Sequence, residues 1–248
     1  MRLSKSWVIA AKDFKTFSKK KNIIYSIAAV PFIVAVLIPL VIDFAGQRNG
    51  AAGIPEARLV VLLPSFLFFY LILAAYLPTP IASYTIVGEK VEKSLEPLLA
   101  TPTTDSEILL GKGISAFLPP LGGVFGGAVV FMILMDLVSH GTLGYYYFPN
   151  WNTGIVLLLM VPLAVAMSVG ANVIISSRVT DVRTGQQLGA FMVAPFAGIY
   201  VGGELNIVSL GDTSNLLIIS GILLLADLLL LYVARATFRR EEILTKWK

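Results

Sequence analysis

The sequence predicts an all-α polytopic membrane protein with six transmembrane helices, and three observations support this fold class. The 248 residues are 56 % hydrophobic and only 14 % charged, whereas an average soluble domain carries about 25 % charged residues. The mean hydropathy is +0.82. Six stretches approach or exceed the length of about 20 apolar residues that a helix needs to cross a bilayer core. This composition disfavours a soluble enzyme, a disordered chain and a nucleic-acid-binding domain.

The six apolar stretches are separated by short polar segments. They cover residues 23–42, 59–86, 108–138, 155–175, 187–208 and 216–234. The second and third are longer than one crossing requires, so we expect them to tilt, kink or project beyond the membrane. Several prolines fall inside the stretches, and we interpret each as a helix kink, because transmembrane helices tolerate proline.

The basic residues predict the orientation of the chain. With the N-terminus inside, the inner segments hold 17 of the 19 Lys and Arg residues, and the outer segments hold only Arg48 and Arg58. Positive charge concentrates on the cytoplasmic side of membrane proteins. We therefore expect a multi-pass protein of the cell (plasma) membrane with both termini in the cytoplasm.

The first 22 residues are more basic than the rest of the chain and precede a six-span domain over residues 23–248. They carry seven positive charges and a single acid, Asp13. Their apolar residues recur near helical spacing, at Leu3, Trp7, Ile9, Ala10, Phe14 and Phe17. This pattern predicts an interfacial amphipathic helix on the inner leaflet. The alternative is a basic leader that only sets the topology.

The segment between the second and third stretches, residues 88–112, predicts a short amphipathic helix. Its apolar face has the spacing i, i+4, i+7, i+8, at Val91, Leu95, Leu98 and Leu99. Its acids outnumber its lysines by five to three, which disfavours the anionic inner leaflet as the main contact. A protein partner with a groove for the apolar face is the better interpretation.

Prolines and a capping motif predict where helices begin and end in the same segment. Pro97 predicts a break or a helix start, and Thr101 followed by Pro102 ends the pattern. Thr104 and Glu107 have the spacing of a capping box, so we expect the third long helix to begin there.

This segment resembles the inner loop of type-2 ABC exporter permeases. The matching residues are Glu96, Leu98, Leu99, Thr101, Pro102, Glu107, Leu109 or Leu110, Gly111 and Lys112. Lys93-Ser94 stands where that family has Gly-Thr, and Pro97 is unusual there. The resemblance extends to the six-span layout, the basic N-terminal helix and a polar run before the fifth stretch.

The resemblance implies a permease subunit whose inner loop, near residues 88–102, is a cytoplasmic coupling helix docked in a separate ATPase subunit. The implied coupling residues are Glu89, Val91, Leu95, Glu96, Leu98, Leu99, Thr101 and Pro102. The chain has no phosphate-binding loop, because no Gly lies five residues before Gly111-Lys112 and Gly113 follows the lysine. We therefore expect no enzyme activity and no bound cofactor in this chain, with ATP and Mg²⁺ on the partner ATPase.

The resemblance therefore predicts that the chain is the permease of an ATP-driven exporter and works by alternating access. We expect a homodimer or a paired permease, contact with membrane lipid, an apolar or amphipathic substrate, and no nucleic-acid partner. Two alternatives stay open. One is an ATP-independent secondary transporter or channel subunit, although no internal repeat is evident. The other is a non-transporting ABC transmission subunit.

Two acids fall inside the apolar stretches, where an ionisable group costs about 2.5–3.5 kcal/mol on insertion scales. Asp227 either pairs or hydrogen-bonds within the protein, or takes part in gating or translocation. Asp136 lies near the outer end of its span, and we expect it to reach the headgroups; a role in gating or translocation is the alternative. With no cysteine and one histidine, the sequence predicts no metal site of several such ligands.

Small residues gather in the third stretch, at Gly122, Gly123, Gly126 and Gly127. They form two overlapping small-xxx-small pairs, which let another helix approach closely. They serve either packing within the chain or the contact between two permeases.

Overall fold

The computed structural model describes residues 3–48, 54–89, 103–179, 181–205 and 207–237. The regular elements in these ranges are all helical. In chain order they are α1 (Leu3–Phe17), α2 (Lys21–Arg48), α3 (Glu56–Tyr76), α4 (Pro78–Ser83), the π-helical η2 (Tyr84–Gly88), α7 (Asp105–Leu143), α8 (Trp151–Gly154), the π-helical η3 (Ile155–Met160), α9 (Val161–Arg178), α10 (Val182–Ala190), α11 (Val193–Glu204) and α12 (Thr213–Thr237).

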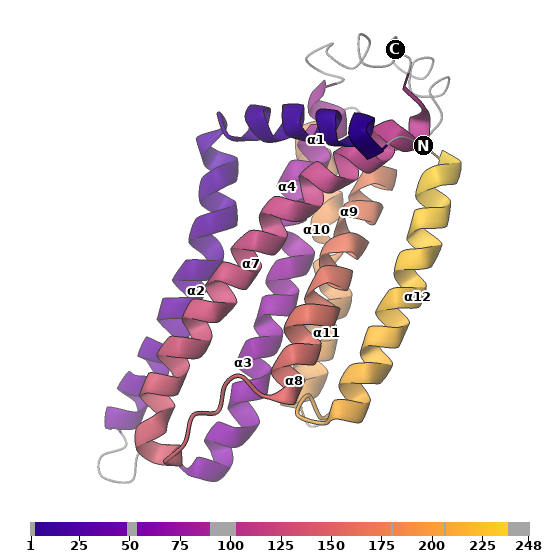
Figure 1. Ribbon diagram of the computed structural model, residues 1–248. Coiled ribbons are helices and arrows are strands. Elements are labelled where there is room, and N and C mark those ends of the chain that lie inside the picture. The colour runs from indigo at the N-terminus through magenta and orange to yellow at the C-terminus, as the bar shows by residue number, and fades with distance from the viewer. Residues whose placement is uncertain (1–2, 49–53, 90–102, 180, 206, 238–248) are drawn as a thin grey trace.

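Among the described residues, five helical stretches are long and apolar enough to cross a membrane. They are Ile23–Gln47, Glu56–Ser83, Asp105–Leu143, Trp151–Arg178 and Thr213–Arg235. α7 has 39 residues and is therefore about 58 Å long at 1.5 Å per residue, nearly twice the thickness of a hydrocarbon core. It runs diagonally across the bundle, as expected for an overlong span (Figure 1).

The expected fifth span, residues 187–208, is not one continuous helix. The chain turns at Phe191 and Met192, between α10 and α11. Pro195 explains the break, because it has no amide hydrogen for the Phe191 carbonyl and its ring would clash with that group in a continuous helix. The Ala194 amide instead donates to the Phe191 carbonyl over 3.0 Å in a tighter turn.

α10 and α11 nevertheless follow α3 and α4 in the opposite direction. At one end, a Cβ atom on Gly185 would lie 3.4 Å from the hydroxyl oxygen of Ser83. Further along, the rings of Tyr200 and Phe69 are 6.2 Å apart in an edge-to-face arrangement. The broken pair therefore lies along the α3–α4 helix at least from Phe69 to Ser83.

α2 and α7 pack closely through small residues on α7. A Cβ atom on Gly127 would lie 2.5 Å from the Cβ of Pro31, and one on Gly123 would lie 2.6 Å from the Ile27 carbonyl oxygen. The Tyr70 hydroxyl of α3 lies 3.3 Å from the Pro31 carbonyl and 3.2 Å from the Gly127 carbonyl, so it connects the two helices. Gly123 and Gly127 thus allow close packing of α2 and α7 within the chain.

A buried polar cluster joins α4 and α9 inside the bundle. The Asn172 amide donates to the Thr79 hydroxyl over 3.2 Å and accepts from Ser83 over 3.3 Å. Gly189 of α10 lies directly against the Asn172 side chain, where a Cβ atom would overlap it. These hydrogen bonds hold the helices that α10 packs against.

α1 lies across one end of the bundle, at the same end as the last turns of α12 (Figure 1). Ile9, Ala10 and Phe17 are buried against the rest of the chain, whereas Leu3 and Trp7 are exposed. The helix crosses α7 at Gly111, where a Cβ atom would come within 2.7 Å of the Ser6 carbonyl oxygen.

Candidate functional site

A buried lysine lies where α1, η2 and the first turns of α7 meet. The side chain of Lys112 is only 1 % exposed, although it follows an apolar turn of α7. Its Nζ donates to Glu89 Oε2 over 2.5 Å and to the Thr85 carbonyl oxygen over 2.7 Å. Lys112 therefore fixes the end of η2 against α7.

Asp13 and Lys12 bring α1 into the same cluster. Asp13 Oδ2 lies 3.9 Å from Lys112 Nζ and accepts a hydrogen bond of 3.1 Å from the Ser115 hydroxyl. Lys12 is half exposed and donates to Glu89 Oε1 over 2.9 Å. Both oxygens of Glu89 are thus held by lysines from different helices.

The charges in the cluster balance, with two lysines facing two carboxylates. Burial raises the pKa of Asp13 above its ordinary value, and the attraction of Lys112 offsets only part of this effect. A second contact strengthens the junction of α1 with η2, because the rings of Phe17 and Tyr84 lie 6.4 Å apart, edge to face. We refer to Lys12, Asp13, Glu89 and Lys112 as the ion cluster.

The ion cluster stands at the start of the expected coupling segment, and a helix cap stands at its end. Thr104 is the N-cap of α7, and its hydroxyl accepts from the Glu107 amide while the Glu107 carboxylate accepts from the Thr104 amide. The capping box expected from the sequence is confirmed. Both ends of the segment are therefore held on α7, one through Lys112 and the other through Thr104.

Of the eight expected coupling residues, Glu89 is the one that the structure places in this cluster. The other seven lie outside the described residues: Val91, Leu95, Glu96, Leu98, Leu99, Thr101 and Pro102. Two residues of the resembling motif now have physical roles. Gly111 lets α1 cross α7 closely, and Lys112 forms the ion cluster.

The family profile of the ABC-2 family transporter proteins matches residues 7–215, from α1 into α12. The chain belongs to this family. It is a multi-pass membrane permease of an ABC transporter, a class whose members are typically non-enzymatic transmembrane subunits. Membership implies association with an ABC ATPase subunit. A comparison with curated proteins finds no match.

Asp227 of the permease is buried on α12, and 6 % of the residue is exposed. Within the described residues, neither carboxylate oxygen has a hydrogen-bond partner. The structure therefore provides no pairing for Asp227 among these residues. A role in gating or translocation stays a prediction.

Asp136 of the permease is not directed at the headgroups. It is buried and accepts hydrogen bonds of 3.0 Å from the backbone amides of Tyr147 and Phe148. These bonds fasten the connection after α7 to the end of that helix. The geometry assigns Asp136 a structural contact, which the sequence position alone did not indicate.

Three of the four glycines in the small-xxx-small pairs of α7 face α2. Gly123 and Gly127 contact its backbone, and Gly126 lies opposite the Phe32 ring, where a Cβ atom would be 3.2 Å away. Gly122 differs, because no atom lies within 4 Å of a Cβ built there. A contact between two permeases through Gly122 stays a prediction.

Sequence reasoning missed the roles of Asp13, Lys12 and Lys112. Two signals were available in the sequence. Asp13 is the single acid among the seven basic residues of the N-terminal segment, and Lys112 is the one lysine inside the third apolar stretch. An ionisable residue in an apolar segment requires a partner, and the two charges are opposite.

Proposed function

We propose that this permease is the transmembrane subunit of an ATP-driven exporter and works with a separate cytoplasmic ATPase that binds residues 88–102. The observation that supports this proposal best is the ion cluster. It fixes the start of the segment to both α1 and α7, because Glu89 contacts Lys12 over 2.9 Å and Lys112 over 2.5 Å. A segment held in this way can pass a displacement to whole helices.

The physical reason is the rigidity of buried, hydrogen-bonded ion pairs. Charges attract more strongly at low dielectric than in water, and removing one partner leaves a costly buried charge. Movement of Glu89 therefore requires movement of Lys112 with it. In our proposal, ATP binding moves the coupling segment, and the ion cluster and the Thr104 cap carry that motion into α7 and α1.

The proposal includes six crossings with both termini in the cytoplasm. α10 and α11 together make the fifth crossing, because they extend along the α3–α4 helix from Ser83 to Phe69. The permease has no cysteine, so single introduced cysteines report sidedness directly. We expect Gly50→Cys to react with an impermeant thiol reagent from outside and Lys246→Cys only from inside. Reaction of Lys246→Cys from outside would contradict the topology.

We further propose that two permeases form the translocation path between them, since six helices leave little room for a path within one chain. The cargo is apolar or amphipathic, because the spans carry few charges. Asp227 is the candidate gating residue. If Asp227→Asn and Asp227→Leu both leave transport unchanged, this role is wrong.

Co-purification tests the docking step. The permease is expressed with its partner ATPase, and the ATPase recovered with tagged permease is measured. We expect Leu95→Asp to abolish recovery, because a charge on the apolar face opposes burial in a groove. Lys93→Ala, on the polar face of the same segment, is the matched control and retains recovery. Full recovery with Leu95→Asp would overturn the docking assignment.

A further inference from the structure

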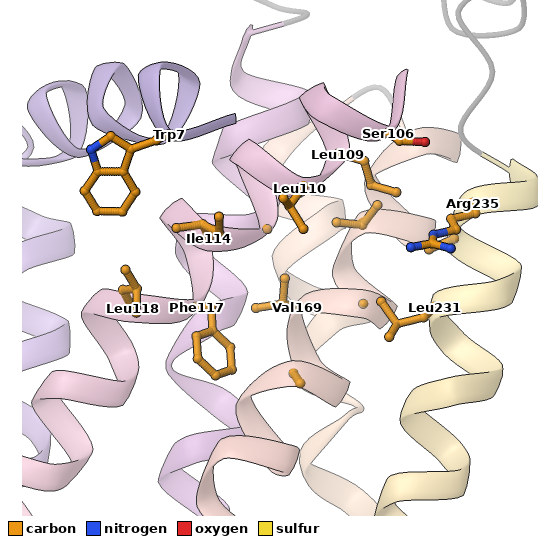
Figure 2. A pocket seen from close by; sticks show the side chains of 15 residues that line it. Trp7, Ser106, Leu109, Leu110, Ile114, Phe117, Leu118, Val169, Leu231 and Arg235 are labelled. Carbon is orange, nitrogen blue, oxygen red and sulfur yellow. The ribbon is translucent and has the colours of Figure 1, made fainter. Parts of the chain in front are cut away.

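An apolar groove of about 450 Å³ opens between α1, α7, α9 and α12, at the end of the bundle that carries α1 (Figure 2). Its walls include Leu110, Ile114 and Phe117 of α7 and Val169 of α9. Among the described residues that line it, Arg235 is the only charged one. The groove is thus apolar along its walls and cationic at its mouth.

Small residues create the hollow. Gly113 on α7, Ala166 and Gly170 on α9, and Ala234 on α12 all line it. Nothing lies within 4 Å of a Cβ atom built on Gly113. The helices therefore do not use this glycine for close packing with one another, and the space beside it is available to another molecule.

The groove matches one leaflet of a bilayer in length. Its α7 wall extends at least from Ser106 to Phe117, which is about 16 Å for eleven residues at 1.5 Å each. Half of a hydrocarbon core about 30 Å thick is about 15 Å. An acyl chain lying along α7 would therefore be covered over a length close to the thickness of one leaflet.

The mouth carries groups that recognise a lipid headgroup. Trp7 and Arg235 lie on opposite sides of the groove, near the end of it that lies at α1 (Figure 2). No hydrogen bond or ion pair to Arg235 occurs within the part of the chain that the structure describes. A guanidinium binds phosphate with two parallel hydrogen bonds, and Trp favours the membrane–water interface.

We propose that this groove binds one acyl chain of an anionic phospholipid, with the lipid phosphate at Arg235. The charge of Arg235 and the length of the apolar wall together fit this occupant. The inference rests on membrane insertion of the permease and not on the direction of transport or the docking of an ATPase. Its failure would therefore leave the proposed function intact.

Fluorescence of Trp7 tests the proposal in vesicles of neutral phosphatidylcholine. Trp151→Phe and Trp247→Phe make Trp7 the sole tryptophan, since the chain has three. Phosphatidylglycerol or phosphatidylcholine with a brominated acyl chain is added at the same low mole fraction. Bromine quenches tryptophan at contact, so we expect stronger quenching by the brominated phosphatidylglycerol. Equal quenching by the two lipids would overturn the proposal.

Three variants separate the groove from the general attraction of anionic lipid to the lysines of α1. Gly113→Leu fills the hollow without loss of helix propensity, and we expect it to remove most of the excess quenching. Gly141→Leu, in open space on the same helix outside the groove, is the matched control and retains the excess. Arg235→Gln lowers the preference for the anionic lipid about fivefold, the effect of one basic side chain near an anionic surface.

The outcomes decide between a site and a surface effect. If the excess persists in Gly113→Leu, the lipid is held by the basic face of α1 and the groove assignment is wrong. Loss of the excess in Gly141→Leu as well would also overturn it, because the change would then follow any added side chain. Thermal unfolding of each variant verifies that it is folded.

Discussion

Replacing Lys112 with Met removes the buried cation of the ion cluster and keeps a side chain of similar length. Lys112 is almost fully buried and donates to Glu89 over 2.5 Å and to the Thr85 carbonyl over 2.7 Å. The change leaves the carboxylates of Glu89 and Asp13 without their shared buried cation. Breaking a buried ion pair from one side costs about 3–5 kcal/mol, so we expect the free energy of unfolding to fall by that amount.

The interaction itself is measured by a double-mutant cycle with Glu89→Gln. The double variant leaves fewer uncompensated charges. We therefore expect its loss in free energy of unfolding to be smaller than the sum of the losses in the two single variants by at least about 1 kcal/mol. Lys12→Met removes a half-exposed partner of the same carboxylate and costs about 0–1 kcal/mol. Lys15→Met, an exposed lysine of α1, is the control and changes stability by less than about 0.5 kcal/mol.

Equilibrium unfolding in mixed micelles, followed by circular dichroism, provides these free energies. Two results would refute the reasoning. The first is a Lys112→Met variant no less stable than Lys15→Met. The second is strict additivity of Lys112→Met and Glu89→Gln, because independent side chains do not show a coupling energy.

Three further predictions concern packing, a buried carboxylate and pH. Gly127→Leu lowers the free energy of unfolding by about 1–3 kcal/mol, because its Cβ would lie 2.5 Å from Pro31, whereas Gly122→Leu, in open space on the same helix, does not; equal stabilities would contradict this. Asp136→Ala leaves two backbone amides unpaired and costs about 1–3 kcal/mol for each, again measured by unfolding. Because the pKa of Asp13 is raised above 3.8, Asp13 stays protonated up to a higher pH in the folded state than in the unfolded state. The stability of the permease then falls as the pH rises from about 4 through the raised pKa, and Asp13→Asn removes this fall.

The membrane fold was accessible from the sequence because span length is set by the bilayer. Each apolar run can be recognised from its own residues without knowledge of the others. The Thr104–Glu107 capping box is likewise defined by residues that are close in sequence. The break at Phe191 was missed because proline within a transmembrane helix usually leaves the helix continuous. α2 keeps Pro31 and Pro39 inside one helix, so the sequence alone does not distinguish a kink from a break.

The ion cluster could not be located from the sequence, because it joins residues that are distant along the chain. Glu89 is 77 residues from Lys12 and 23 from Lys112. Their contact depends on how α1 crosses α7. The two helices can cross so closely because Gly111 has no side chain. A resemblance marked Gly111 and Lys112 as part of a motif, but only the packing of three elements shows what they contact.

The most direct test of the central claim is a distance measured inside the permease while its ATPase binds nucleotide. Leu137 of α7 and Leu217 of α12 are both exposed and can be changed to cysteine for spin labels in this cysteine-free chain. Labelled permease is mixed with excess unlabelled permease, so that each distance lies within one chain. We expect ATP to shift the distance in the complex, and the shift to disappear in the Lys112→Met variant that still binds the ATPase. A distance that does not respond to ATP, or a shift of the same size without Lys112, would contradict the proposal that ATP drives this permease through the ion cluster.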